Sequence, residues 1–286
     1  MKFNFCFSSK KSPKRVLFSK EECNALFSAL LIDDKIDLDV SMPDSTHINY
    51  TQDQLWNCYQ ISLQLWEEGI KREALCLIID KIYNQGKLNE QDQYSYYCMR
   101  AKIKHLRFAF ALFDKSHTYP TVFHWMAAIM GHLQDILKNA QSSSIWPVVM
   151  LVRLFLSKPL YAISSREVYR FKPSTSEQFK NYVNDGINFI RAQLEKDKMT
   201  SHEFHEIRKV ISRLVAFYDC MYILYPSDYQ HAVLLYLSTI NGLMGSMHDD
   251  LIAADFNKIQ NYHKDTFLLP EEIRVRLKAF TDKYHY

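Results

Sequence analysis

Glycine is scarce in this sequence: six of the 286 residues are glycine and eight are proline. Tight β-hairpins depend on glycine or Asn-Gly turns, so this scarcity argues against a turn-rich β protein. A strong excess of one charge is also missing, because the formal net charge is only +3. Nucleic acid is therefore not an expected partner, and any site for a polyanion must be local.

Cysteine motifs and long apolar runs are lacking as well. None of the six cysteines lies in a C-x-x-C motif, and most lie in apolar helical patterns, which predicts free, buried thiols in a reducing compartment. The most apolar run, residues 145–161, is interrupted by Pro147, Arg153, Lys158 and Pro159. It is too short and too charged for a membrane span of about 20 apolar residues. No signal-peptide pattern opens the sequence, so we expect a cytoplasmic protein without a membrane partner.

The residues that are present favour helices. Apolar residues make up 48% and charged residues 23% of the chain, which is typical of a folded globular protein. Apolar positions recur mostly with a helical period, and only residues 1–7 suggest an alternating strand. Predicted helices cover residues 20–33, 52–67, 70–85, 92–114, 119–140, 145–164, 176–197, 201–225, 228–256 and 270–284. We therefore predict an all-α fold.

Capping boxes mark four of the predicted helix starts. They pair Ser19 with Glu22, Thr51 with Gln54, Ser174 with Glu177, and Thr200 with Glu203. Pro270 is expected to be the first residue of the last helix, where its missing N–H does no harm.

The chain is predicted to consist of a tail and two halves. Residues 1–18 contain the basic stretch KKSPKR and read as a solvated tail. The loop at residues 164–176 is the expected boundary between a first helical bundle, residues 19–164, and a second one, residues 165–286.

One predicted helix combines a core face with a row of cations. The stretch CMRAKIKHLRFAFALF, residues 98–113, contains Arg100, Lys104 and Arg107. At about 100° per residue these three side chains lie within about 60° of one another, beside the apolar face. The pattern predicts a basic stripe along the edge of the core.

The same pattern returns 108 residues later, in HEIRKVISRLVAFYDCM at residues 205–221. Five apolar positions superpose: Met99 on Ile207, Ile103 on Ile211, Leu106 on Leu214, Phe110 on Tyr218, and Phe113 on Met221. Arg100 falls on Arg208, and His105 falls on Arg213. In the helix that follows each copy, Gly131 and Asp135 match Gly245 and Asp249 at a shift of 114. This order predicts an internal duplication.

The duplicated pattern resembles the CHAD domain family, α-helical domains named for a characteristic histidine. In that family the first helix of each set reads H-x-x-R-x-x-x-[RK]-R-L-R, and the next helix carries L-G-x-x-x-D. The second copy here supplies His205, Arg208, Arg213, Leu214, Gly245 and Asp249, and the first supplies Arg100, Lys104, Leu106, Arg107, Gly131 and Asp135. The copies depart from the pattern at Tyr97, Met130, Ser212 and Val215.

The resemblance implies two helical bundles related by a pseudo-twofold axis, here with an extra N-terminal helical segment, and binding of inorganic polyphosphate between them. Arginine binds phosphate oxygens in a bidentate manner and lysine acts as a point charge, which suits such a ligand. The expected site residues are Arg100, Lys104, Arg107, His205, Arg208, Lys209 and Arg213. We expect a non-enzymatic protein that needs no metal or other cofactor.

Two alternatives remain open. Arg100 and Arg208 could instead form structural ion pairs with Asp135 and Asp249, in a scaffold that binds a protein partner. Helical metal phosphohydrolases use a His, an adjacent His-Asp pair and a later Asp. Here the ligands would be His248 and Asp249 with His205 or His231 before them and Asp265 or Asp282 after them. The repeat accounts for Asp249 without a metal, because Gln134 precedes Asp135 in the first copy.

Overall fold

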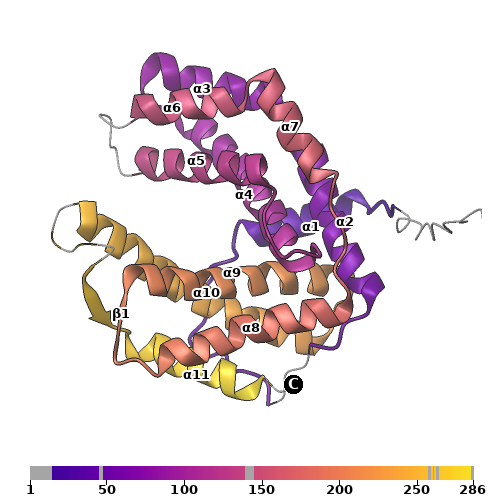
Figure 1. Cartoon of the computed structure of the whole chain (residues 1–286), viewed down its shortest axis with the longest axis vertical. Coiled ribbons are helices and arrows are strands. Elements are labelled where there is room, and N and C mark those ends of the chain that lie inside the picture. The colour runs from indigo at the N-terminus through magenta and orange to yellow at the C-terminus, as the bar shows by residue number, and fades with distance from the viewer. Residues whose placement is uncertain are drawn as a thin grey trace, which may run out of the picture.

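The computed structural model of the chain describes residues 15–44, 48–138, 145–256, 259, 261 and 264–284. In these residues the predicted all-α fold is confirmed (Figure 1). The helices are α1 (Lys20–Leu30), α2 (Gln52–Gly69), α3 (Arg72–Gln85), α4 (Glu90–Phe113), α5 (Thr121–Lys138), α6 (Ile145–Phe155), α7 (Lys158–Val168), α8 (Ser176–Leu194), α9 (Ser201–Leu224), α10 (Asp228–Phe256) and α11 (Glu271–Lys283). Two short strands, β1 (Lys198–Thr200) and β2 (Thr266–Leu268), pair antiparallel.

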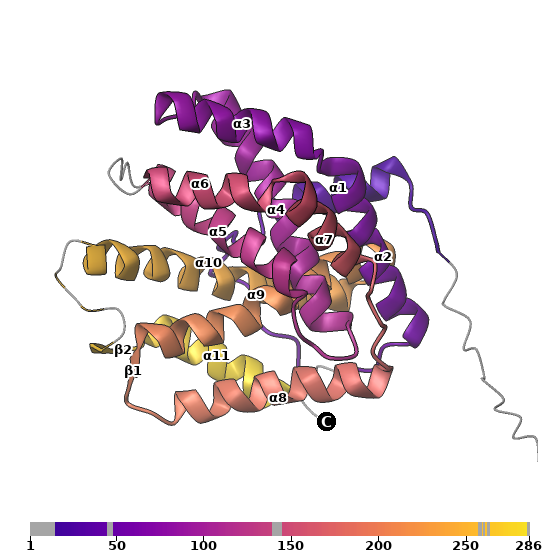
Figure 2. The ribbon, with the colours of Figure 1, turned by 45° about the horizontal axis from the view of Figure 1, so that its top comes forward.

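The helices form two layers that are joined along one side. Figures 1 and 2 show α3, α5, α6 and α7 in one layer and α8 to α11 in the other. The helices α1, α2 and α4 all pack against α9, so they connect the layers. One connected cluster of buried apolar side chains extends through both layers.

The apolar positions that superpose between the two sequence copies are core residues. Nine of the ten are buried: Ile103, Leu106, Phe110 and Phe113 in α4, and Ile207, Ile211, Leu214, Tyr218 and Met221 in α9. The tenth, Met99, is partly buried against the same cluster. Helical spacing of apolar residues thus fixes which face of α4 and of α9 is turned inward.

Three of the four predicted capping boxes are confirmed, at Ser19, Thr51 and Thr200. The box predicted for Ser174 is wrong, since Thr175 caps α8 and pairs with Gln178. The reason is tertiary: the N–H of Ser174 donates to the carbonyl oxygen of Phe113 (2.8 Å), which holds the chain extended at that residue. The last helix also begins one residue later than predicted, because Pro270 is the N-cap residue and α11 starts at Glu271.

The predicted helix at residues 145–164 is divided into α6 and α7, which meet at a bend of 66°. Pro159 lies in the first turn of α7, where its ring is compatible with a helix start but not with a continuous helix. Among the described residues, no single helix has the length and apolar character to cross a membrane. The strand suggested at residues 1–7 lies outside the described residues.

Residues 31–44, here called the crossover segment, follow α1 and cross to the second layer. Its backbone is held by side chains of α10 and α11. Thr239 accepts a hydrogen bond from the N–H of Asp37 (3.1 Å), and Arg276 donates to the carbonyl oxygen of Leu38 (2.7 Å). Lys283 donates to the carbonyl oxygen of Met42 (2.9 Å).

Candidate functional site

The basic stripe predicted for α4 lies beside its buried face. The helix start is capped by Asn89, whose side-chain oxygen accepts a hydrogen bond from the N–H of Asp92 (2.8 Å). The apolar residues then face the core, and Arg100, Lys104 and Arg107 are left half-buried at its edge.

The stripe predicted for α9 is built in the same way. The hydroxyl of Thr200 caps the helix by accepting a hydrogen bond from the N–H of Glu203 (3.2 Å). The predicted site residues on this helix are all half-buried: His205, Arg208, Lys209 and Arg213.

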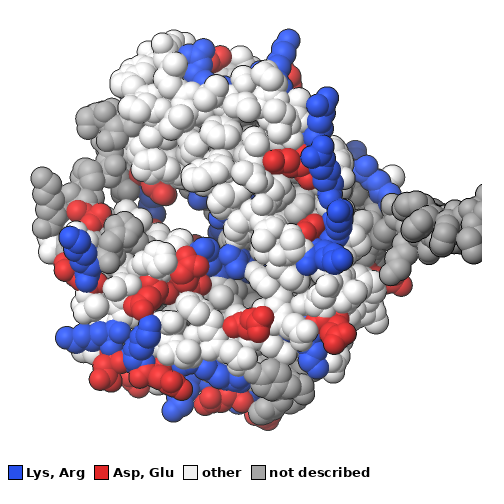
Figure 3. Space-filling model, in the orientation of Figure 1, with Lys and Arg blue, Asp and Glu red and all other residues white. Residues whose placement is uncertain are grey.

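The two stripes face each other where α4 packs against α9. Arg208 is close enough to Lys104, and Arg213 to Arg107, for direct electrostatic repulsion. Figure 3 shows an opening between the two layers, with Lys and Arg side chains along one of its sides. Lys138 of α5 also forms an ion pair with Asp249 of α10 (2.5 Å). Residues that are about a hundred positions apart in the sequence therefore meet in one cationic cluster.

Each of the two matching arginines lies over a matching glycine. A Cβ atom at Gly131 of α5 would be 3.0 Å from the Nη2 atom of Arg100, and a Cβ atom at Gly245 of α10 would be 3.2 Å from that of Arg208. The absence of a side chain at both glycines lets the guanidinium groups lie against the neighbouring helix.

Arg100 does not form the ion pair that the structural alternative requires. It has no hydrogen bond or ion pair with any described residue, and its buried Nε atom lacks a partner among them. Asp135 interacts with it only over a longer distance. Burial raises the pKa of Asp135, and the charge of Arg100 opposes this rise. The guanidinium is thus held in place by packing, with donors left over for a ligand.

Lys104 forms an ion pair with an acidic residue of the crossover segment. Its Nζ atom is 3.5 Å from an Oδ2 atom of Asp33 in the crossover segment. Asp33 raises the pKa of Lys104, but burial and the positive charges of Arg100 and Arg208 outweigh this effect and leave the pKa below its ordinary value. The lysine therefore experiences a strongly positive surrounding.

Arg107 and Arg213 share a tyrosine that the sequence did not reveal. Arg213 donates hydrogen bonds to the hydroxyls of Tyr119 (2.5 Å) and of Tyr182 (2.7 Å). The guanidinium carbons of Arg107 and Arg213 lie 5.4 and 5.5 Å from the Tyr119 ring centre. Burial, together with Arg100 and Arg213, lowers the pKa of Arg107. Arg213 is thus largely engaged by protein groups.

The histidines of the cluster are neutral at pH 7. The rings of His205 and His248 are 5.0 Å apart. Burial lowers the pKa of both to about 4, assisted by Lys209 for His205 and by Arg208 for His248. The His124 ring stacks on Tyr119 at 4.8 Å, and its pKa is lowered by burial and then by Arg107 and Lys209. Sequence reasoning did not select His124.

Metal ligation has little support in this cluster. Within the described residues, no group of three or more His, Cys, Asp or Glu side chains is arranged to hold a metal ion. His205 and His248 lie together, and Asp249 is 3.9 Å from the Nδ1 atom of His248.

His105, which matches Arg213 in the repeat, is buried behind the stripe. Its Nε2 atom lies 3.0 Å from the hydroxyl of Ser62 and 3.5 Å from the sulfur of Cys220. Burial raises the pKa of Cys220, but Cys58 and His105 lower it by more, to about 5. The predicted free thiols are confirmed for the described cysteines, of which Cys23, Cys58 and Cys220 are buried.

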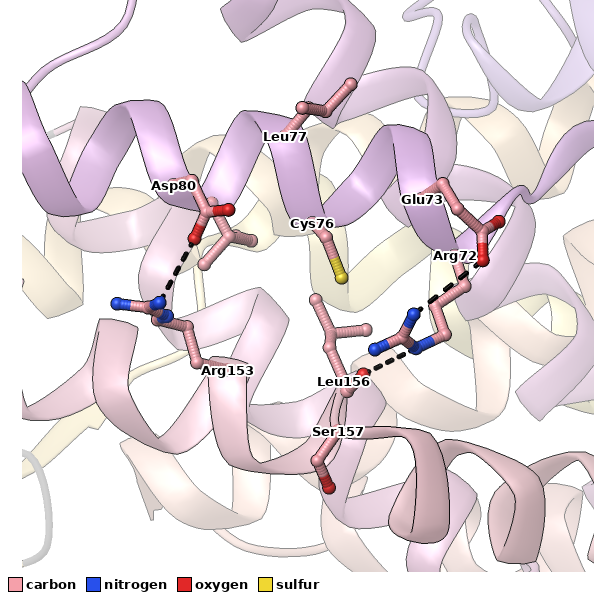
Figure 4. Close-up of a pocket in the computed structure, with 9 residues that line it drawn as sticks. Arg72, Glu73, Cys76, Leu77, Asp80, Arg153, Leu156 and Ser157 are labelled. Atoms are coloured by element: carbon pink, nitrogen blue, oxygen red, sulfur yellow. Dashed lines mark hydrogen bonds and ion pairs between the residues drawn. The ribbon is translucent and has the colours of Figure 1, made fainter.

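A second cavity lies between α3, α6 and the start of α7 (Figure 4). Its two cationic side chains, Arg72 and Arg153, each form an ion pair with an acidic residue. Arg72 pairs with Glu73 (3.6 Å) and donates to the carbonyl oxygen of Leu156, and Arg153 pairs with Asp80 (3.4 Å). This cavity therefore lacks the excess positive charge of the α4–α9 cluster.

Comparison with known proteins adds no assignment. No protein-family model matches the chain, and neither the curated proteins nor the solved structures include a significant match.

Proposed function

We propose that this protein binds a linear polyanion, with inorganic polyphosphate as the leading candidate, in a basic groove between two helical bundles related by an internal duplication. One observation carries the proposal: two cationic stripes from helices far apart in the sequence face each other across α4 and α9. Such a concentration of half-buried positive charge is costly without a counterion, and a polyphosphate chain supplies one negative charge per phosphate.

The duplication has geometric support. Arg100 lies over Gly131, and Arg208 lies over Gly245, so the same pair of residue types makes the same contact in both proposed bundles. A glycine inside a helix costs about 1 kcal/mol relative to alanine. Two such costs at matched positions are consistent with one ancestral arrangement that was copied.

The residue types favour binding over catalysis. Guanidinium and ammonium groups stabilise phosphate charge but exchange protons poorly near pH 7. His205 and His248 are neutral at pH 7, because burial lowers the pKa of both to about 4, so neither offers an imidazolium as a general acid. The proposed role is therefore non-enzymatic and independent of a cofactor.

The test is replacement of Arg100, Lys104 and Arg107 together by Gln, which keeps the side-chain stem and the helix propensity. We expect affinity for long-chain polyphosphate to fall by about 100-fold. The slope of log affinity against log salt concentration should become shallower by the equivalent of about two to three phosphate contacts. The matched control replaces the exposed Lys71, Lys87 and Lys278 by Gln, which removes the same charge elsewhere. Fluorescence or calorimetric titration measures binding, and a thermal melt measures stability.

A protein-interaction scaffold is the second candidate, and one surface feature favours it. The apolar side chains of Trp146, Met150, Leu151 and Leu154 on α6 are 45–53% exposed. Exposed apolar groups that cluster on one helix are typical of protein contacts. If the triple variant binds polyphosphate as well as the wild type but melts far lower, the stripe is structural and the scaffold becomes the better candidate.

A further inference from the structure

Asp33 is fixed at the cationic cluster by its backbone. Its carbonyl oxygen accepts hydrogen bonds from the hydroxyl of Ser238 (3.1 Å) and from the amide of Asn241 (3.0 Å), both on α10. Asn241 is itself oriented by Ser212 of α9, whose hydroxyl donates to its side-chain oxygen (2.7 Å). The position of Asp33 is therefore set by two helices of the second layer.

The close approach of the crossover segment also depends on a glycine. A Cβ atom at Gly242 would collide with the carbonyl oxygen of Asp34 and with the side chain of Ile36. Any larger residue at this position would push the segment away from α10. Gly242 thus lets the backbone beside Asp33 pass directly over the helix.

The side chain of Asp33 faces the stripe of α4. Its carboxylate lies 3.5 Å from the Nζ atom of Lys104, and both side chains keep some solvent contact, at 21% and 32% exposure. The two residues also line one cavity, together with Tyr97, Arg100 and His105. A phosphate group bound to Lys104 in this cavity would therefore lie beside the carboxylate of Asp33.

We propose that Asp33 is an internal competitor for the polyanion, occupying Lys104 until a ligand phosphate displaces it. This inference rests on the proposed function of the groove. Displacement separates the Asp33–Lys104 pair and leaves a negative charge beside the incoming phosphate. Asp33 thereby lowers the affinity, and its freed carboxylate offsets one of the positive charges that the ligand neutralises. Polyanions that are short or carry little charge cannot replace the carboxylate, so they do not bind at this end of the groove.

The experiment compares Asp33→Asn with Asp39→Asn by polyphosphate titration at several salt concentrations between about 50 and 200 mM. Asp39 belongs to the same segment and is exposed, and its side chain forms no hydrogen bond or ion pair with a described residue. Its variant also removes one carboxylate, so the change in net charge is the same. We expect Asp33→Asn to bind roughly three- to tenfold more tightly at low salt. The slope of log affinity against log salt should steepen by about one phosphate contact, and Asp39→Asn should change neither quantity.

A second variant keeps the carboxylate and moves the segment. Gly242→Ala displaces the backbone at Asp34 and should also tighten binding. Because Asp33 keeps its charge in this variant, the result distinguishes the effect of its position from the effect of its charge. Equal affinities and slopes for wild type, Asp33→Asn and Asp39→Asn overturn the competitor role while leaving the proposed function standing. Absence of polyphosphate binding in the wild type and in Asp33→Asn alike overturns both.

Discussion

The two halves of the proposed groove share the contact of an arginine with a glycine but differ in the residues at other matched positions. Tyr97 and Gln134 of the first half match His205 and His248 of the second half, and the two histidine rings are 5.0 Å apart. Lys104 of the first half is matched by Ser212, which hydrogen-bonds Asn241 instead of offering charge. The first half therefore holds the more available cations, and the second half holds the pair of neighbouring histidines.

The difference extends to the partners of the cations. In α9, Lys209 donates to Glu206 (2.8 Å) and Arg213 donates to two tyrosines. In α4, Arg100 has no hydrogen bond with a described residue, and the hydrogen bond of Lys104 to Asp33 is long, at 3.5 Å. Engaged cations stabilise the fold, whereas cations with spare donors are suited to a ligand. If the groove binds a polyanion as proposed, the second stripe contributes mainly to stability and the first mainly to binding.

The largest expected effect comes from Arg213. Replacing it by Gln removes a half-buried guanidinium from two tyrosine hydroxyls and should lower the free energy of unfolding by about 2–4 kcal/mol. The corresponding change at Arg100 should cost less than about 1 kcal/mol, because no hydrogen bond to a described residue is lost. Urea denaturation of the two single variants measures the contrast. Equal losses of stability would remove the distinction between the stripes.

The pH dependence should arise from the second half. His205 and His248 have a pKa of about 4 in the folded protein, below the ordinary value of about 6.5. Between these values the unfolded chain binds protons that the folded protein does not. The contribution of these two histidines to the free energy of unfolding therefore falls as the pH falls from 6.5 towards 4, and it is constant above 6.5. The loss is at most about 1.4 kcal/mol per pH unit for each histidine, and solvent exposure reduces it.

Denaturation at pH 7.5 and 5.5 tests this assignment. The double variant His205→Gln with His248→Gln should lose much less stability on acidification than the wild type. His202→Gln is the control, because His202 lies on the same helix but is exposed. Polyphosphate binding should strengthen at low pH only when both histidines are present, since a bound polyanion raises the pKa of neighbouring imidazoles. A control that behaves like the double variant would argue against this assignment.

The smallest expected effect concerns the matched glycines. Gly131→Ala and Gly245→Ala each place a methyl group 3.0–3.2 Å from an arginine that can yield by a few tenths of an ångström. The gain in helix propensity of about 1 kcal/mol offsets this contact, so stability should change little. Polyphosphate affinity should fall about two- to fivefold in both variants, because each guanidinium is shifted. Titration of the pair checks whether the two positions are equivalent, and a marked inequality would weaken the duplication.

Local patterns predicted much of the helix content but not the contacts between distant segments. The faces of α4 and α9 followed from apolar spacing, and the caps at Thr51 and Thr200 followed from residue type. Ser174 was chosen wrongly because its N–H donates to the carbonyl oxygen of Phe113, 61 residues away, which keeps it extended. The break between α6 and α7 was missed because a strong apolar period outweighed Pro159.

The site was predictable where one helix supplies it. Arg100, Lys104 and Arg107 could be identified because their spacing places them on one stripe. Asp33, Tyr119, His124 and Tyr182 carry no such signal, since they come from other helices and from loops. Only the packing of the layers brings them to the cluster, and no local sequence pattern indicates such contacts between distant segments.

The crossover segment also has a consequence for the order of events during synthesis. Asp37 docks on Thr239 and Met42 docks on Lys283, residues that are 202 and 241 positions further along the chain. At about 5–20 residues per second, the ribosome needs about 10–50 s to make the partners after the segment has emerged. We therefore expect the crossover segment to remain undocked until α10 and α11 have been made. Asp33 then reaches its final position late in folding, so in a nascent chain Lys104 is not yet paired with the carboxylate of Asp33.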